Sequence, residues 1–324
     1  MGEKTDKTYY GPFKLYPLKY PFAQEYFDIA LANTWFPQEV PLGEDLIDWE
    51  SKLTKADKQC LQHFLSFFGT AEALVANNIG LAKYGMFSEA EIRMYLGRHE
   101  FEELLHAQTF NYIIDSLNLD RNELYTVEKV KEIFEKESFI TGYTRILRET
   151  KFKTEHDKIR ALFKDLWAFY GILEGTFFFS GFLIGLAFEN RQLLKGIATL
   201  LRYILRDESV HLAFGFDLMK AIAAEHPKIM DNKFKHELSS MMEKGVQLEI
   251  KYAMKALPSA VIGLTHEQYI MHVKYIADRR LEAIGLKKRY NVESPLKWAT
   301  TITDLPELIN FFEAKTFDYQ FKIK

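Results

Sequence analysis

A long stretch without proline is the feature that most restricts the fold of this chain. The 324 residues include nine prolines, but none lies between residues 42 and 226. Proline breaks the interior of a helix, so this stretch is free to form long helices. Within it, apolar residues recur at spacings of three and four, which predicts four long helices. Their ranges are Lys55–Tyr84, Ser88–Ser116, Lys158–Glu189 and Gln192–Glu225.

The same periodicity predicts further helices outside these four. Their ranges are Glu128–Lys136 with Thr141–Arg148 as one helix, Lys233–Ala256, and Thr265–Ile284. From Asn291 onward the helical pattern is lost, and the composition is typical of an extended segment that a partner would order. We therefore expect an all-α chain with a single helical domain over residues 1–290 and a C-terminal arm over residues 291–324.

Composition excludes several classes of function. The formal net charge of -3 provides no basic field that would attract nucleic acid or an anionic membrane. Cys60 is the only cysteine, which rules out an intrachain disulfide, a zinc–cysteine cluster and a dithiol redox couple. Met1–Tyr10 lacks the apolar run of a secretory signal, and the apolar run Phe177–Phe188 is shorter than a membrane helix. We expect a cytoplasmic protein without nucleic-acid or membrane partners.

Two Glu-x-x-His sequences lie in the predicted helices: Glu103 with His106, and Glu208 with His211. Residues three apart lie on the same face of a helix, so each pair can reach one metal ion. A single pair is weak evidence, because the chain has nine histidines and a pair on a helix surface is common. The repetition of the pair is what carries the prediction.

Each pair follows a helix that carries a lone glutamate among apolar or small residues. Glu72 precedes Glu103 by 31 residues, and Glu174 precedes Glu208 by 34. Four carboxylates in one core would need cations to neutralise them. One glutamate from each of two helices, with Glu-x-x-His from each of two others, is the known ligand pattern of ferritin-like di-iron and di-manganese bundles. We identify the chain as a ferritin-like helical bundle with a dinuclear metal-carboxylate site in its four-helix core.

Carboxylate and imidazole ligands suit iron and manganese, and the ligand types alone do not choose between them. Three apolar residues are spaced so that they face the site: Phe178 and Phe182 follow Glu174 by four and eight, and Ile204 precedes Glu208 by four. They could form a dry shell around the side of the metals that reacts with oxygen. Ordinary core packing would place them in the same way, and both interpretations stay open.

At this point the motifs resemble the small subunit of class I ribonucleotide reductase. The resemblance runs from about Tyr26 to Tyr319. It rests on Phe-Glu-Glu-Leu-Leu-His at 101–106, Tyr-Ile-Leu-Arg-Asp-Glu-Ser-Val-His at 203–211, and Trp-Phe-Pro-Gln-Glu at 35–39. It implies a subunit that, once activated by molecular oxygen, stores a one-electron oxidant. That oxidant would initiate ribonucleotide reduction in a separate large subunit, a step of deoxyribonucleotide biosynthesis for DNA replication.

The resemblance also implies roles for single residues. It assigns the ligands to two metals, as Glu72, Glu103 and His106 for one, and Glu174, Glu208 and His211 for the other. Trp35 and Asp207 match the family's hydrogen-bonded route between the metals and the surface, and Tyr319 matches the tail tyrosine that passes the radical to the large subunit. Taken singly, these three residues would be a core tryptophan, a helix-surface acid and a solvated aromatic.

One departure from the common family pattern is informative. Most members carry a radical-bearing tyrosine four residues after the first ligand histidine, and this chain has Phe110 there. Phenylalanine has no phenolic proton to lose. With Glu72 in place of aspartate, Phe110 resembles the chlamydial subgroup, class Ic. That subgroup implies a mixed Mn/Fe cofactor whose manganese holds the oxidising equivalent, while a di-iron or di-manganese pair stays possible. Tyr203 matches a tyrosine that relays an electron during activation.

A partner is required, because the chain has one cysteine and no phosphate-cradling glycine loop. The resemblance implies a homodimer that docks on the large subunit through its C-terminal tail. Three alternatives stay open. An oxygen-activating ligand-binding oxidase or hydroxylase would share the six ligands but would need a substrate cavity beside the metals. An iron-storage protein would use a shorter subunit, and purely structural acids would bind no metal.

Overall fold

The computed structural model describes residues 15–125, 131–257 and 263–303 of the chain. No β-strand occurs among these residues, and every regular element within them is helical. The all-α prediction is therefore confirmed. The longer helices are α2 (Pro21–Ala32), α3 (Gly43–Ser51), α4 (Lys55–Asn78), α5 (Ala90–Ser116), α7 (Lys131–Glu149), α8 (Glu155–Leu166), η5 (Trp167–Phe178), α9 (Phe179–Asn190), α10 (Lys195–Glu225), α11 (Asn232–Ala256) and α12 (His266–Ala283). The shorter ones are η1 (Pro37–Glu39), η2 (Ile79–Lys83), η3 (Tyr84–Met86), α6 (Arg121–Leu124), η6 (Pro227–Ile229) and α13 (Lys297–Thr303).

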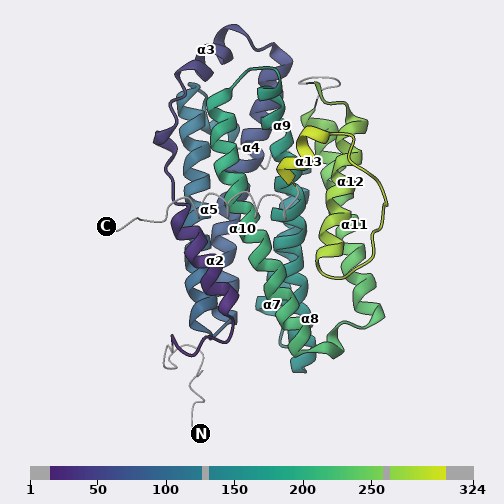
Figure 1. The fold of residues 1–324 in the computed structure, drawn as a ribbon. Helices are drawn as coiled ribbons and strands as arrows, with labels where there is room; N and C mark the ends of the chain where they lie inside the picture. Colours follow the sequence, from purple (N-terminus) through teal and green to yellow (C-terminus); the bar gives the residue numbers. More distant parts are fainter. Residues whose placement is uncertain (1–14, 126–130, 258–262, 304–324) are drawn as a thin grey trace, which may run out of the picture.

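The four predicted long helices form the centre of the molecule (Figure 1). α4 packs against α5, and α10 packs against η5 and α9, which continue α8 as one long helix. Contacts of α10 with α5 and of α4 with α9 close these four into a bundle. On one side α2 lies along α5, and on the other α11 and α12 pack against each other and against η5.

Local capping signals fix where several helices begin. The Thr54 side chain accepts a hydrogen bond from the backbone N–H of Asp57, and the Asp57 side chain accepts one from the backbone N–H of Thr54. This reciprocal pair satisfies two N–H groups at the start of α4. Thr154 and Asp231 cap α8 and α11 with their side chains. The predicted helix starts at Lys55 and Lys233 therefore lie within one residue of the observed ones.

The helix η5 is a π-helix, in which backbone hydrogen bonds span five residues instead of four. Side chains bond two of its carbonyl groups. The Thr176 hydroxyl donates to the Gly171 carbonyl at 2.8 Å, and Arg280 Nε donates to the Gly175 carbonyl at 2.8 Å. Glu174 lies between these two carbonyls in the sequence. The periodicity predicted the helix but not its wider turns, because these depend on partners such as Arg280 that lie elsewhere in the fold.

One helix among the described residues, Glu155–Asn190, is long and apolar enough to cross a membrane by length and composition. Its most apolar window is entirely buried inside the molecule. The prediction that Phe177–Phe188 is a buried core helix is therefore confirmed. The phenylalanine rings of this segment fill the space between the surrounding helices.

Several helices were not predicted from the sequence, among them the short α6, η1 and η6 and the three helices α2, α3 and α13. α2 and α3 lie in or next to the proline-rich start, and α13 lies in the segment predicted as an arm. Leu296 and Ala299 are buried, and Ser294 Oγ lies 2.7 Å from His272 Nδ1, so residues 291–300 pack against the core. The domain boundary at residue 290 stays a prediction. Tyr319 lies outside the described residues.

Close packing of α10 on η5 yields a stability prediction. Gly215 lies against the ring of the fully buried Tyr170, and a methyl group there would overlap the ring. We expect Gly215→Ala to lower the free energy of unfolding by about 1–3 kcal/mol, since overpacking forces a core side chain to shift. In the matched control Gly142→Ala, nothing lies within 4 Å of the added group. That variant should gain roughly 0.5–1 kcal/mol from helix propensity. Denaturant unfolding of both variants measures the difference, and equal shifts would contradict this packing.

Candidate metal centre

The six predicted ligands converge in the middle of the bundle. They are Glu72 from α4, Glu103 and His106 from α5, Glu174 from η5, and Glu208 and His211 from α10. All six side chains are fully buried, at 0 % exposed. Since the four helices that carry them pack against one another, residues far apart in the sequence share one small volume.

The ligand atoms form two overlapping groups. One group is Glu72, Glu103, His106 and Glu208, and the other is His99, Glu103, Glu174 and His211. Within each group, one nitrogen or oxygen atom from every residue lies within 4.8 Å of the others. Two adjacent positions that each gather four donors fit a dinuclear centre.

Two glutamates lie between the groups. Glu208 directs Oε1 toward His106 Nδ1, at 3.2 Å, and Oε2 toward His211 Nδ1, at 3.5 Å. Glu103 places Oε1 3.0 Å from His211 Nδ1 and Oε2 4.0 Å from His106 Nδ1. Each carboxylate therefore faces both histidines, in a bridging arrangement. The resemblance instead assigns one of these glutamates to each metal.

Burial raises the free energy of the ionised form of these carboxylates. Burial, and next the neighbouring charge of Glu208, raises the pKa of Glu103 and of Glu174 well above the usual range. In the described structure both carboxylate oxygens of Glu72, Glu174 and Glu208 lack a hydrogen-bond partner. Buried oxygens with open lone pairs beside imidazole nitrogens are suited to bind divalent cations such as iron and manganese. The residues present fit a pair of metal ions.

His106 and His211 both direct their Nδ1 atom toward the cluster. Nδ1 of each faces the carboxylates, while Nε2 lies 3.3 Å from Asp207 Oδ2 in the first and 3.0 Å from Glu102 Oε2 in the second. Burial by itself lowers a histidine pKa, but the contacts with these acids and the nearby negative charges of the inner glutamates raise the pKa of both histidines well above its usual value. An outer carboxylate that accepts the Nε2 proton leaves the Nδ1 lone pair available to a metal.

Glu102 and Asp207, which we call the outer acids, are related by position as well as by contact. Each directly precedes the Glu-x-x-His glutamate of its own helix, yet each binds the histidine of the other helix. Arginines hold both of them: Arg98 Nη2 lies 2.9 Å from Glu102, and Arg206 Nε lies 3.4 Å from Asp207. Asp207 was predicted from the sequence, whereas Glu102 was not, although Glu102 belongs to the Phe-Glu-Glu-Leu-Leu-His motif.

Three of the predicted relay residues lie together on the His106 side. Trp35 Nε1 donates a hydrogen bond of 2.6 Å to Asp207 Oδ2, the same oxygen that lies near His106 Nε2. The ring of Tyr203 lies 5.2 Å from the ring of Trp35, centroid to centroid. Trp35 is buried, and Tyr203 is partly buried. A continuous path of contacts therefore runs from Tyr203 through Trp35 and Asp207 to the cluster.

Phe110 lies in a group of aromatic rings. It stacks on Phe68 at 5.3 Å, and Phe68 in turn contacts Phe178 at 5.1 Å and Phe182 at 4.7 Å. These rings are buried, and so is Ile204, the third residue of the predicted apolar shell. The arrangement is compatible with both interpretations of that shell, a dry wall beside the metals and ordinary core packing.

His99 was not identified from the sequence. It lies on α5 four residues before Glu103 and seven before His106, a spacing that places all three on one helix face. This spacing was the available signal, but a lone histidine on an apolar face matches no motif. Burial, followed by the neighbouring His211 and His106, lowers the pKa of His99 well below its usual value, so the ring is neutral near pH 7.

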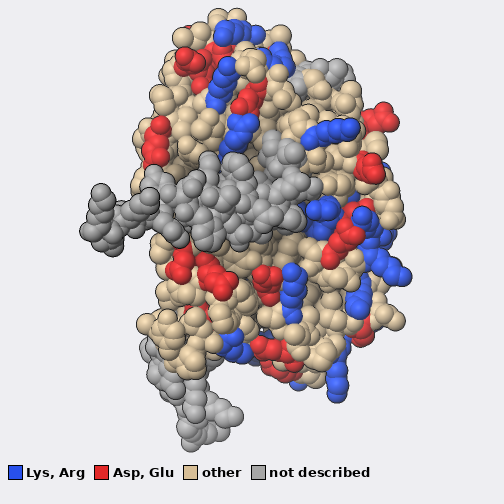
Figure 2. Space-filling model, in the orientation of Figure 1, with Lys and Arg blue, Asp and Glu red and all other residues tan. Residues whose placement is uncertain are grey.

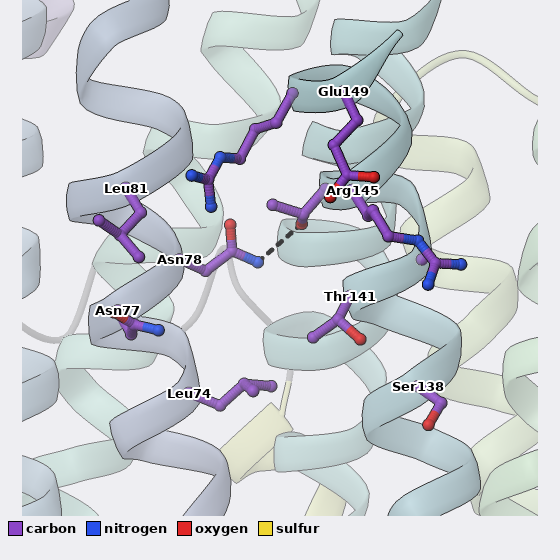
Figure 3. Close-up of a pocket in the computed structure, with 11 residues that line it drawn as sticks. Leu74, Asn77, Asn78, Leu81, Ser138, Thr141, Arg145 and Glu149 are labelled. Atoms are coloured by element: carbon purple, nitrogen blue, oxygen red, sulfur yellow. Dashed lines mark hydrogen bonds between the residues drawn. The ribbon is translucent and has the colours of Figure 1, made fainter.

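A separate cavity of about 380 Å³ lies between the α4–η2 segment and α7 (Figure 3). Asn78 projects into it from α4 and donates a hydrogen bond of 2.9 Å to Thr144. Arg145 and Arg148 of α7 also line it. None of the six predicted ligands lines this cavity, so it is distinct from the cluster.

Comparison with known proteins places this geometry in a family. The family model described as ribonucleotide reductase, small chain, matches residues 12–295. The ribonucleoside-diphosphate reductase subunit beta of Chlamydia pneumoniae is 39% identical over 310 residues, which cover 95% of this chain and 90% of that protein.

Solved structures of ribonucleotide reductase small subunits and of a related oxidase share the fold of this chain. The ribonucleotide reductase R2 subunit from Clostridium botulinum matches with a TM-score of 0.80 and 26% identity, over 88% of this chain and 89% of that one. An R2-like ligand-binding oxidase from Sulfolobus acidocaldarius matches with a TM-score of 0.69 and 22% identity, over 87% and 94%. The second likeness shows a shared fold alone. With the family model matching most of its length, the chain belongs to the ribonucleotide reductase small-chain family.

Proposed function

We propose that this chain generates and stores the one-electron oxidant that initiates ribonucleotide reduction in a separate large subunit. The observation that carries the proposal is a buried cluster of glutamates and histidines, suited to two metals, that is joined to Trp35 by way of Asp207. A ligand-binding oxidase of the same fold would use the cluster but has no need of this connection. A storage protein would need neither the connection nor a partner.

The six predicted ligands would hold the metals, and the outer acids would orient the two ligand histidines. When bound, the metals supply reversible one-electron redox chemistry, reached by reaction with molecular oxygen. Glu72 and Phe110, with 39% identity to the Chlamydia pneumoniae protein, favour a mixed Mn/Fe pair over a di-iron or di-manganese pair. The Phe110 ring, stacked on Phe68, offers no phenol that could store a radical.

Asp207 would couple electron movement to proton movement. Loss of an electron from the Trp35 indole makes its Nε1 proton acidic, and Asp207 Oδ2 is 2.6 Å away to accept it. The same oxygen lies 3.3 Å from His106 Nε2 and so fixes the orientation of that ring. Tyr203, in contact with Trp35, would serve as the further donor during activation.

The reducing thiols would come from the large subunit. Cys60 is fully buried, and burial raises the pKa of its thiol to about 12, so it is neither a nucleophile nor an accessible reductant. The C-terminal arm, predicted over residues 291–324, would dock on the large subunit through the part beyond residues 291–300, which pack against the core, and would bring Tyr319 to it. That residue lies outside the described part of the chain.

A homodimer is favoured by apolar side chains on the outer surface of the ligand helix. Phe101 and Leu104 of α5 are exposed, and Leu31 and Phe36 are exposed in and after the neighbouring helix α2. Apolar surface on adjacent helices is suited to association with a second copy.

The charge distribution on the face in Figure 2 supports a cytoplasmic protein without nucleic-acid or membrane partners. On the face in Figure 2, lysine and arginine side chains are interspersed with aspartate and glutamate and do not form one basic patch. Nucleic-acid binding generally needs such a patch.

Metal loading tests the subgroup. When the metal-free protein is loaded with both metals in oxygen, we expect elemental analysis to find equal manganese and iron, and activity to require the large subunit. Phe110→Tyr should leave the metal content unchanged, because Phe110 is not among the ligands, and Phe110→Leu is its apolar control. Full activity with iron and no manganese would overturn the mixed pair.

Glu72 and Glu103 should differ in their effect on metal binding. Glu72 belongs to one ligand group, whereas Glu103 belongs to both. Loss of a residue that only orients a ligand lowers metal affinity by up to about 100-fold. We therefore expect Glu72→Ala to lower the metal affinity of one position by more than about 100-fold, and Glu103→Ala to lower the affinity of both positions. Competition titration with a chelator measures each position, with the exposed Glu149→Ala as control. Equal effects of the first two variants would contradict the bridging geometry.

The relay is tested at Trp35. Trp35→Phe removes the Nε1 donor to Asp207 and should lower turnover with the large subunit by at least about 100-fold, the scale of a lost proton-transfer group. Metal content should stay unchanged. The control is Trp49→Phe on α3, whose ring packs near Lys58. If Trp35→Phe keeps the turnover of the wild type, Trp35 has no place in the route.

A further inference from the structure

We propose that His99 is a third imidazole ligand of the metal centre, at the end formed by Glu174 and His211. This inference rests on the proposed two-metal function and adds to it a ligand outside the six residues of the sequence pattern. His99 is fully buried and lies on the face of α5 that carries Glu103 and His106.

The inner nitrogen of His99 lies where a metal ligand would lie. Nε2 is 3.0 Å from Glu103 Oε1 and 3.2 Å from Glu174 Oε1. The ring centroid is 3.7 Å from that of His211, whose Nδ1 is also 3.0 Å from Glu103 Oε1. Bonds of about 2.1 Å from one ion to two donors at about 90° separate those donors by about 3.0 Å. The donors from α5, η5 and α10 therefore surround one common point.

A hydrogen bond from His99 to one carboxylate accounts less well than metal binding for the position of His99 Nε2 near both Glu103 and Glu174. The Nε2 of a neutral imidazole can donate one proton, and the contact with Glu103 already has hydrogen-bond geometry. Glu174 Oε1, although 3.2 Å away, has no hydrogen-bond partner in the described structure. A nitrogen lone pair directed between the two carboxylates satisfies both contacts if all three bind one cation.

The outer nitrogen of His99 also has the partner that a ligand histidine needs. Nδ1 lies 3.5 Å from the hydroxyl of the buried Tyr170, which can accept its proton and hold the ring. Histidine ligands usually bond an outer partner in this way. Because Gly215 has no side chain, the Tyr170 ring can pack directly against its backbone.

With His99 included, the two metal positions become unequal. The position of Glu72 has one imidazole, His106, among its donors, whereas the position of Glu174 has two, His99 and His211. Imidazole nitrogen favours iron over manganese more than carboxylate oxygen does. His99 would therefore raise the preference of the Glu174 position for iron.

Cobalt substitution tests the proposal on the full-length chain. Co(II) alone is added to metal-free protein in which histidine is labelled with ¹⁵N, and the exchangeable imidazole N–H protons shifted by cobalt are counted by NMR. We expect three such signals in the wild type, from Nε2–H of His106 and His211 and from Nδ1–H of His99. Two signals with both cobalt ions bound would overturn the role of His99 and leave the two-metal function standing. Absence of bound cobalt would overturn both.

Variants give a second, independent readout. His99→Gln should keep two of the three signals and lower the affinity of one cobalt position by at least about tenfold, while the other position changes little. The matched control is His272→Gln, which alters a buried histidine on α12 and should keep all three signals. Three signals in His99→Gln would also overturn the assignment. The count in the wild type does not depend on how well any variant folds.

Discussion

The structure depends on placing four glutamates inside an apolar helical bundle. Each ionised carboxylate removed from water costs several kcal/mol even after the surroundings relax. The fold offsets part of this cost with imidazoles directed at the carboxylates, and several carboxylate oxygens have no hydrogen-bond partner among the described residues. Helices α4, α5, η5 and α10 must therefore pack closely enough for cations to bridge them. The aromatic core around them keeps water away, which strengthens every interaction inside.

The two Glu-x-x-His helices are related by a reciprocal exchange of outer acids. Asp207 of α10 binds His106 of α5, and Glu102 of α5 binds His211 of α10. This exchange ties the two helices to each other through their ligands. Both outer acids contact an arginine, but Asp207 also accepts a hydrogen bond from Trp35, and this donor breaks the equivalence. The contacts of Trp35 and Tyr203 therefore extend from the cluster on the His106 side, so the two similar halves of the site have different surroundings.

Much of this could be predicted from the sequence, since periodicity and motif spacing are local signals. The four long helices were predicted, and all six candidate ligands come together in the structure. α2 and α3 were missed because the prolines at the start of the chain hide helices that tertiary packing stabilises. His99 and Glu102 were missed for a different reason. Their roles come from contacts with Glu174 and His211, which are distant in the sequence.

The π-helix η5 has a consequence for how chains of this kind can change in length. Removing one residue from a π-helical turn leaves an α-helical turn, so flanking helices keep their packing while the residues between them rotate. Single-residue insertions and deletions should therefore be tolerated better in η5 than in α4 or α10. Glu174 lies in this segment. The ligand set of this half of the site could thus diverge in evolution through changes of length, a route that the regular helix around Glu72 does not provide.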